Sequence, residues 1–219
     1  MDAYANLLIW VVVLGCIVIL FMFKHRKRFY TVKMKIRRAL PAPWTLYEFL
    51  HLKPSRWGLG QYYSFSEETV RSLGYRFIGR FDRAIFHWED TPVLDLIIEH
   101  KFPTKYLPEN KRPEDMFQTG LYALALYESG VSCSTTLLIN VYCLQDQAIR
   151  CMEGNSMKDC WGCGGGKIHI SQFDPNKVIK SLEKIDEIWY RGRKPKPSPE
   201  KEKCRACPYS RDRCNYSAF

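Results

Sequence analysis

Two apolar stretches separated by an amphipathic segment constrain the fold of this chain more than any other feature. Residues 93–102 are rich in leucine and isoleucine, and residues 135–144 form a second apolar run. Such runs are typical of central strands that helices cover on both faces. Between them, residues 114–129 carry apolar side chains at helical spacing and end at Gly130. The pattern predicts an α/β fold with a mixed central β-sheet flanked by helices.

The rest of the chain is predicted to alternate short elements with polar turns. Asp174 and Pro175 mark the start of a further helix, because aspartate caps helices and proline suits their first position. Gly192 is expected to end it. Two short helices are expected at residues 44–52 and 67–73, strands at residues 75–88 and 167–173, and an irregular cysteine-bearing segment at residues 145–166.

An apolar run at the amino end predicts a membrane anchor. Residues 7–23 contain no charged side chain, and with the residues just before them they are about long enough to cross a bilayer as a helix. Five basic or histidine residues follow at 24–28, so the amino terminus is expected outside and the remainder in the cytoplasm. A cleaved signal peptide is the alternative, but its basic start and small-residue cleavage site are missing. The sequence therefore predicts a single-pass membrane protein that contacts the membrane through residues 5–23.

The charge balance favours a polyanionic partner or an anionic membrane surface. The 219 residues carry a formal net charge of +10. A solvated basic face is the simpler explanation for part of this charge.

Three short motifs follow one another along the predicted sheet and helix. They are Gly79-Arg80-Phe81-Asp82, Glu99-His100-Lys101 and Gln118-Thr119-Gly120-Leu121-Tyr122. Because side chains alternate along a strand, Glu99 and Lys101 are expected on one face, together with Asp95. The preceding strand would place Asp82 near Glu99. Gln118 and Tyr122 are one helical turn apart and share a face.

These residue types suit metal-assisted cleavage of a phosphodiester. Two converging carboxylates, Asp82 and Glu99, hold a hard cation such as Mg²⁺ or Mn²⁺ through oxygen. Lys101 can orient a water molecule or stabilise charge on the scissile phosphate. Gln118 and Tyr122 would touch a DNA backbone or brace the metal site. The alternative is an exposed ion pair between Glu99 and Lys101, with Asp82 as a turn residue.

With these motifs, the chain resembles the RecB-like branch of the PD-(D/E)XK nuclease superfamily. Within it, the chain is most similar to the CRISPR-associated RecB-like exonucleases, the fourth Cas family. The resemblance covers about residues 44–214 and includes the tail motif Cys204-x-x-Cys207-Pro208-Tyr209. It implies a restriction-endonuclease-like core, a metal-dependent DNA exonuclease acting on ends or single strands, and nuclease or adaptation-complex proteins as partners. With the predicted anchor, the expected protein is a membrane-anchored DNA nuclease. The implied roles are metal ligands for Asp82 and Glu99, the catalytic lysine for Lys101, and the fourth motif for Gln118 and Tyr122.

The chain departs from this family at two points. The family usually has a histidine before the GxxD motif, and His51 is the one candidate between the basic flank and Asp82. The family's first cluster cysteine has no counterpart in residues 50–56. A nuclease fold that has lost catalytic competence, and serves as a tethered DNA-binding or complex-assembly module, is therefore the alternative function.

The cysteines form a second candidate site. Cys204, Cys207 and Cys214 lie in a short basic tail, where neighbouring cations favour thiolates. The resemblance implies that such a triplet joins one distant cysteine to hold a [4Fe–4S] cluster, with Cys163 as the candidate fourth ligand. The first alternative is a Zn²⁺ site in which Cys160 and Cys163 join tail cysteines as four thiolates. The second is that Cys151, Cys160 and Cys163 are free thiols in a loop. Cys133 and Cys143 are expected to be core residues.

The predicted organisation has four parts. They are a transmembrane anchor with its basic flank at 1–28, a juxtamembrane linker at 29–43, a nuclease core at 44–192, and a linker with the cysteine tail at 193–219. Candidate phosphate contacts are Arg80, Arg83, Lys105, Lys111 and Arg112, and candidate stacking residues are Trp57, Tyr62, Tyr63 and Trp161.

Overall fold

The chain divides into two compact units. In the computed structural model, the first unit is Met1–Val178 and the second is Ile179–Phe219. The residues that the structure describes are 10, 13–15, 31–52, 58–153, 160, 163–197, 199 and 201–218.

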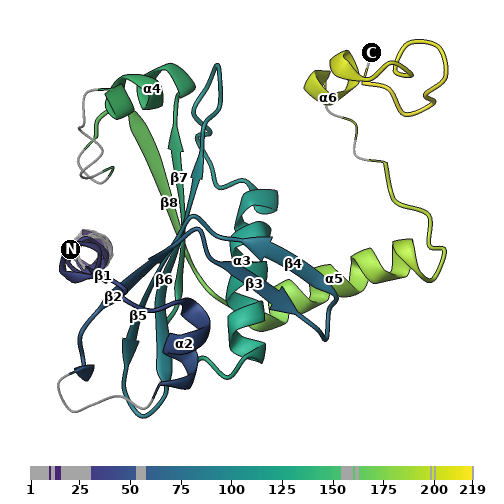
Figure 1. Ribbon diagram of the computed structural model, residues 1–219. Coiled ribbons are helices and arrows are strands. Elements are labelled where there is room, and N and C mark those ends of the chain that lie inside the picture. Colours follow the sequence, from purple (N-terminus) through teal and green to yellow (C-terminus); the bar gives the residue numbers. More distant parts are fainter. Residues whose placement is uncertain are drawn as a thin grey trace, which may run out of the picture. The chain divides into compact units, whose positions relative to one another are not determined.

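A six-stranded mixed sheet forms the centre of the first unit (Figure 1). The strand order is β1-β2-β5-β6-β7-β8. The pairs β1/β2 and β6/β7 are parallel, and the other neighbours are antiparallel. The prediction of a mixed central sheet flanked by helices is confirmed. The strands are β1 Leu40–Pro41, β2 Tyr63–Ser66, β5 Arg83–Trp88, β6 Pro92–Lys101, β7 Leu137–Cys143 and β8 Gly166–Gln172.

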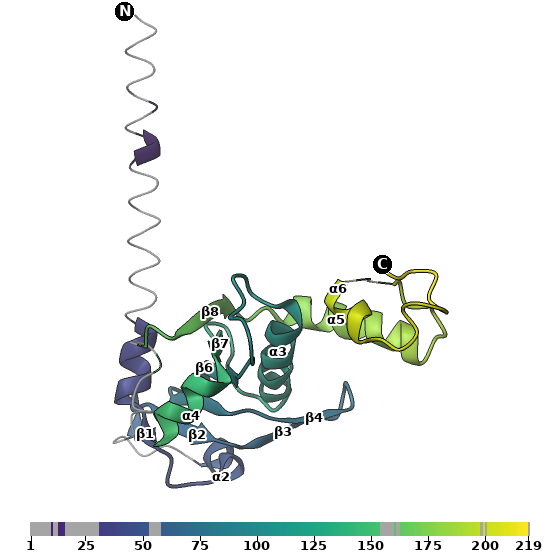
Figure 2. The ribbon, with the colours of Figure 1, turned by 90° about the horizontal axis from the view of Figure 1, so that it is seen from above.

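Helices cover both faces of this sheet, as the apolar runs require (Figure 2). On one face, a helix at residues 31–38 buries Val32 against side chains of the central strands. This helix lies within the stretch expected to be a linker. On the other face, α3 (Pro113–Glu128) connects the parallel strands β6 and β7. A Cβ on Gly120 of α3 would lie 3.8 Å from Leu138 Cδ1. The face of β6 that includes Leu96 and Ile98 therefore meets helix 31–38, and the alternate face meets α3.

A short helix closes the end of the sheet near β2. It is α2 (Leu46–His51), which Thr45 caps through a capping box with Glu48. Phe49 of α2 is fully buried, and its ring packs on Phe65, Phe86 and Trp88 at centroid distances of 5.0 to 5.7 Å. The short helix predicted at residues 44–52 is confirmed.

Two predicted assignments are wrong. Residues 67–73 do not form a helix: β3 (Thr69–Ser72) pairs with β4 (Phe77–Arg80) as a separate two-stranded sheet. Exposed and buried side chains alternate along β3, so pairing with β4 decides the conformation over local helix propensity. The segment expected to be irregular begins instead with α4 (Gln145–Glu153), which contains neither glycine nor proline.

The carboxyl-terminal part of the chain begins with α5 (Pro175–Trp189). Asp174 Oδ1 accepts a hydrogen bond from the Asn176 backbone N–H at 3.1 Å, as expected for a residue that begins a helix. The boundary between the two units lies after Val178, inside this helix. In the second unit, Arg193 pairs with Glu187 at 2.6 Å. The cysteine tail contains a further short helix, α6 (Lys201–Ala206).

The predicted transmembrane anchor is corrected. A crossing helix needs about 20 consecutive, mainly apolar residues. Within the described residues, no helix combines the length and the apolar character that a bilayer crossing requires. The predicted localisation as a single-pass membrane protein is corrected with it. Of the segment 5–23 named as the anchor, residues 5–9, 11–12 and 16–23 lie outside the described residues.

Candidate active site

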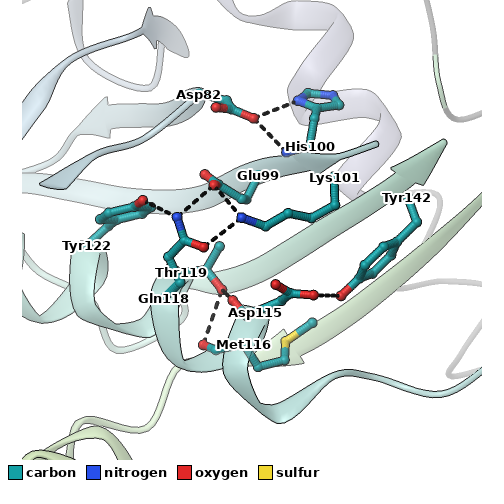
Figure 3. A network of polar contacts seen from close by, with 10 residues as sticks. All are labelled: Asp82, Glu99, His100, Lys101, Asp115, Met116, Gln118, Thr119, Tyr122 and Tyr142. Atoms are coloured by element: carbon teal, nitrogen blue, oxygen red, sulfur yellow. Dashed lines mark hydrogen bonds and ion pairs between the residues drawn. The ribbon is translucent and has the colours of Figure 1, made fainter. Parts of the chain in front are cut away.

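Four of the predicted site residues meet where β6 lies against α3 (Figure 3). Lys101 Nζ donates to Glu99 Oε1 at 3.0 Å and to Gln118 Oε1 at 2.6 Å. Gln118 Nε2 donates to Glu99 Oε1 at 2.9 Å and to the Tyr122 hydroxyl at 2.6 Å. One carboxylate, one ammonium, one amide and one phenol therefore form a continuous hydrogen-bonded group.

Asp82 reaches the same region from the start of β5. The register pairs Arg83 with Ile98, so one step further Asp82 lies beside Glu99. Asp82 Oδ2 accepts a hydrogen bond from the His100 backbone N–H at 2.6 Å and contacts His100 Nδ1 at 3.2 Å. In Figure 3, these contacts join Asp82 to the same stretch of β6 that carries Glu99 and Lys101.

The two carboxylates have opposite pKa shifts. Burial is the largest influence on Glu99 and raises its pKa, and the negative charge of Asp82 adds to this, while Lys101 counters it. Burial also pushes the pKa of Asp82 upward, but the hydrogen bonds and positive charge of His100 outweigh it, so its pKa is lowered. The influence of Asp82 on Glu99 shows that the carboxylates are electrostatic neighbours.

His100 is a site residue that sequence reasoning did not single out. Burial pulls its pKa down, yet hydrogen bonds with Asp82 and Cys160 raise the pKa to about 9. The raised pKa favours the protonated, positively charged form of the imidazole beside Asp82. Strand alternation is the signal that could have drawn attention to His100. Because Glu99 and Lys101 share one face of β6, the residue between them must point to the other face.

Close packing explains why glycine occupies two motif positions, Gly79 in the first motif and Gly120 in the third. A Cβ on Gly79 would lie 2.5 Å from Tyr122 Cε1, so β4 can approach the tyrosine ring only with glycine at this position. A Cβ on Gly120 would lie 2.8 Å from Val178 Cγ2, so this glycine allows close packing of α3 on the first turn of α5.

One atom of the site is suited to a cation. Glu99 Oε2 is buried and, among the described residues, has no hydrogen-bond partner. Together with Asp82 it offers two carboxylates, which is the number Mg²⁺ commonly takes from a protein, with water and substrate phosphate oxygens completing its shell. In the described part of the chain, no group of three or more histidine, cysteine or acidic side chains is arranged to hold a metal ion. A cation held here by Asp82 and Glu99 would take its remaining ligands from water or a substrate.

Asp95 does not share the face of Glu99, contrary to the alternation predicted from sequence. The register between β5 and β6 shifts between Ile85 and Phe86, which pair with Leu96 and Leu94 and leave Asp95 as an extra residue. This bulge turns the buried Asp95 carboxylate toward helix 31–38, where it contacts Lys35 and His87.

Among the described residues, the contacts given for His51 are with Tyr47 and not with Asp82 or Glu99. Its side chain is exposed on α2, and its Nδ1 contacts the Tyr47 carbonyl oxygen at 2.7 Å. The Tyr47 and His51 rings also pack on each other with centroids 4.3 Å apart. Both contacts lie within one short helix.

The cysteines fall in both units. Cys204 is buried and accepts a hydrogen bond from the Ala218 backbone N–H at 3.4 Å, while Cys207 is exposed and Cys214 half-buried.

Cys163 belongs to the first unit, where a Cβ on Gly165 would lie 3.6 Å from its Sγ. Cys143 was expected to be a core residue, but it is only partly buried. Burial raises its pKa most, and the neighbouring Cys163, Cys151 and Cys160 raise it further. Cys133 is buried as expected.

Several predicted nucleic-acid contacts already have partners within the protein. Arg80 pairs with Glu67 at 3.1 Å, and Arg83 donates to Ser64 Oγ at 2.7 Å. Lys111 Nζ donates to Ser171 Oγ at 3.0 Å, whereas Lys105 and Arg112 are exposed. Tyr63 packs on Trp44 and Phe49, and Tyr62 packs on His87. Trp57 and Trp161 lie outside the described residues.

No family model matches the chain, and no curated protein matches it. The interpretation of this site therefore depends on its residues and their geometry.

Proposed function

We propose that this protein is a metal-dependent DNA nuclease of the PD-(D/E)XK type, with an exonuclease's preference for ends or single strands. The observation that carries the proposal is the group formed by Glu99, Lys101 and Gln118, with Asp82 beside it on the neighbouring strand. Carboxylates next to an ammonium suit phosphodiester hydrolysis, because one side holds a cation and the other stabilises developing negative charge.

Each residue has a defined task in this proposal. Asp82 and Glu99 would hold Mg²⁺ or Mn²⁺, which when bound polarises the phosphate and makes water more acidic. Lys101 donates hydrogen bonds from a side chain that is one quarter exposed, so its ammonium can reach a water molecule or a phosphate oxygen. Gln118 holds both Lys101 and Glu99, which keeps their side chains in one orientation. Tyr122 fixes the other end of this amide network.

A cleavage assay tests the proposal directly. The full chain is incubated with end-labelled single-stranded and double-stranded DNA, with Mg²⁺, with Mn²⁺ and with EDTA. We expect cleavage only with a divalent cation. Glu99→Gln removes a charged ligand, and Lys101→Met removes the ammonium while keeping a similar apolar stem. Each is expected to lower the cleavage rate by about a hundredfold or more.

Matched controls separate chemistry from charge. Glu109→Gln and Lys180→Met make the same changes at exposed positions and should cleave DNA like the wild type. Thermal unfolding of all four variants checks that the fold is retained. Full activity in both Glu99→Gln and Lys101→Met would remove the assignment of these residues.

A DNA-binding module without catalysis is the second candidate function. It is favoured by the contacts that already engage the carboxylates, since Glu99 Oε1 accepts two hydrogen bonds and Asp82 Oδ2 contacts His100 twice. Calorimetry with Mn²⁺ distinguishes the two functions. A nuclease site binds Mn²⁺ in the wild type and binds it more weakly in Glu99→Gln, whereas a module shows DNA binding with no binding of Mn²⁺ that depends on this carboxylate.

We also propose a cofactor in the cysteine tail, a [4Fe–4S] cluster. Cys204 and Cys207 are joined by a hydrogen bond from the Cys207 backbone N–H to the Cys204 carbonyl at 3.2 Å, and Cys214 follows in the same short segment. Among the described residues these cysteines are not gathered into a metal-binding group, so cluster binding would draw their thiols together around iron. Anaerobically purified full-length protein should be brown and contain iron. Colourless protein that contains zinc would support the alternative Zn²⁺ site.

A further inference from the structure

An asparagine stands in the middle of an otherwise mainly apolar strand. Asn140 of β7 lies between Ile139 and Val141 and has no exposed surface. Among the described residues, its amide oxygen has no hydrogen-bond donor. Buried polar atoms are normally satisfied, because an unpaired one costs more than an apolar side chain of the same size.

This asparagine is a direct neighbour of the candidate active site. The parallel register of β6 and β7 pairs Glu99 with Asn140 and Lys101 with Tyr142. Paired residues point to the same face of a sheet, so Asn140 and Glu99 both face α3. Glu99 Oε2 is itself buried and unpartnered. Two buried oxygens without a donor, Asn140 Oδ1 and Glu99 Oε2, thus lie on neighbouring side chains.

The polar groups given around Asn140 supply no donor to its amide oxygen. The Tyr142 hydroxyl accepts a hydrogen bond from the Asn140 amide nitrogen and donates its own hydrogen to Asp115 Oδ2 at 2.5 Å. His169, the partner of Asn140 on β8, contacts the Pro108 carbonyl through Nε2 at 3.2 Å. A donor between Asn140 Oδ1 and Glu99 Oε2 would satisfy both open oxygens together.

We propose that Asn140 is a positioning residue of the active site, whose amide holds a water molecule against Glu99 Oε2 and so orients that oxygen toward the bound divalent cation. The inference rests on the proposed function. The water donates one hydrogen to the carboxylate and one to the Asn140 amide oxygen. Groups that orient a metal ligand in this way typically change metal affinity by ten- to a hundredfold when removed.

The test is a comparison of stability with metal binding in Asn140→Leu. Leucine has a similar size and removes the unsatisfied amide oxygen, so the melting temperature should rise or stay unchanged. Calorimetry on the full chain should nevertheless show Mn²⁺ binding about tenfold weaker than in the wild type. Asn110→Leu, at an exposed asparagine, is the matched control and should leave Mn²⁺ affinity unchanged.

If Asn140→Leu does not fold, two variants with smaller side chains test the same role of Asn140. Asn140→Ser keeps a hydroxyl that can hold the water, and Asn140→Ala does not. We expect the serine variant to bind Mn²⁺ more tightly than the alanine variant.

The outcomes separate this inference from the proposed function. Wild-type affinity in Asn140→Leu, or equal affinity in the serine and alanine variants, overturns the role of Asn140 and leaves the nuclease proposal standing. A wild-type protein that binds no Mn²⁺ overturns both.

Discussion

At the scale of single residues, Gly79 shows how a motif position can be steric rather than chemical. The Tyr122 ring is buried and its hydroxyl is fixed by Gln118. We predict that Gly79→Ala forces the ring or β4 to move, because the added Cβ would lie 2.5 Å from Tyr122 Cε1. Overpacking of this kind costs about 1–3 kcal/mol of stability. Urea unfolding measures the loss, and the cleavage assay should show a parallel fall in activity.

Gly164→Ala is the control for this substitution. A Cβ at Gly164 would meet no atom within 4 Å, so the free energy of unfolding should change by less than about 0.5 kcal/mol. If Gly79→Ala is as stable and as active as Gly164→Ala, the close approach of β4 to Tyr122 is not a constraint on this site.

At the scale of elements, the bulge in β6 attaches helix 31–38 to the sheet. It presents the Asp95 carboxylate to Lys35 of the helix and to His87 of β5. The hydrogen bond to Asp95 is the main cause that raises the pKa of His87; burial opposes it, and Glu89 adds to it. Lys35 also lies over the Tyr62 ring, at 5.6 Å from its centroid. The helix is therefore held by a cluster of charges as well as by Val32.

This cluster predicts a pH-dependent stability. A raised pKa means that protonated His87 stabilises the fold fully below its unfolded pKa of about 6.5, and that this contribution is lost as the pH rises through the higher folded value. We therefore expect wild type to exceed His87→Gln in free energy of unfolding by more at a pH of about 6 than at a pH of about 9. Urea titrations at both values measure the difference, and an equal difference at the two would contradict the role of His87.

The predictable part of the fold is the part that local pattern determines. The apolar runs of β6 and β7 and the periodic α3 identified the sheet and the helix that carry Glu99, Lys101, Gln118 and Tyr122. Residues 67–73 were misassigned, because a segment with helix-forming glutamate and leucine becomes β3 only through its partner β4. The helix α4 is not predicted, because the cysteines and glycines that follow it make residues 145–166 as a whole resemble an irregular segment.

The less predictable part of the site arises from register and from the faces of strands. A single extra residue moved Asp95 to the opposite face, and no local pattern marks a bulge in an apolar strand. Asn140 carried a signal that can be recognised in other chains, an isolated amide inside a buried strand. That Asn140 lies opposite Glu99 depends on the parallel register of β6 and β7, which cannot be read from the sequence.

At the scale of the whole molecule, basic charge is spread over both units. The second unit, residues 179–219, contains eleven lysines and arginines against six acidic residues, so it carries a net charge of +5 out of the total of +10. Many of these side chains are exposed, including Lys194, Lys196 and Arg211. A charge of this kind binds nucleic acid through phosphates, with little dependence on sequence.

We therefore predict that DNA binding weakens steeply with salt. Fluorescence anisotropy with labelled single-stranded DNA in EDTA, where no cleavage is expected, should give a linear fall of log affinity against log salt, with a slope of about −0.7 for each phosphate contact. The triple variant Lys194→Gln, Lys196→Gln and Arg211→Gln should have a shallower slope, because fewer counterions are released. The change should be the same for DNA of different sequences, since phosphates carry no sequence information. An unchanged slope in the triple variant would exclude Lys194, Lys196 and Arg211 as phosphate contacts, and an affinity that does not respond to salt would exclude phosphate contacts as the main source of binding.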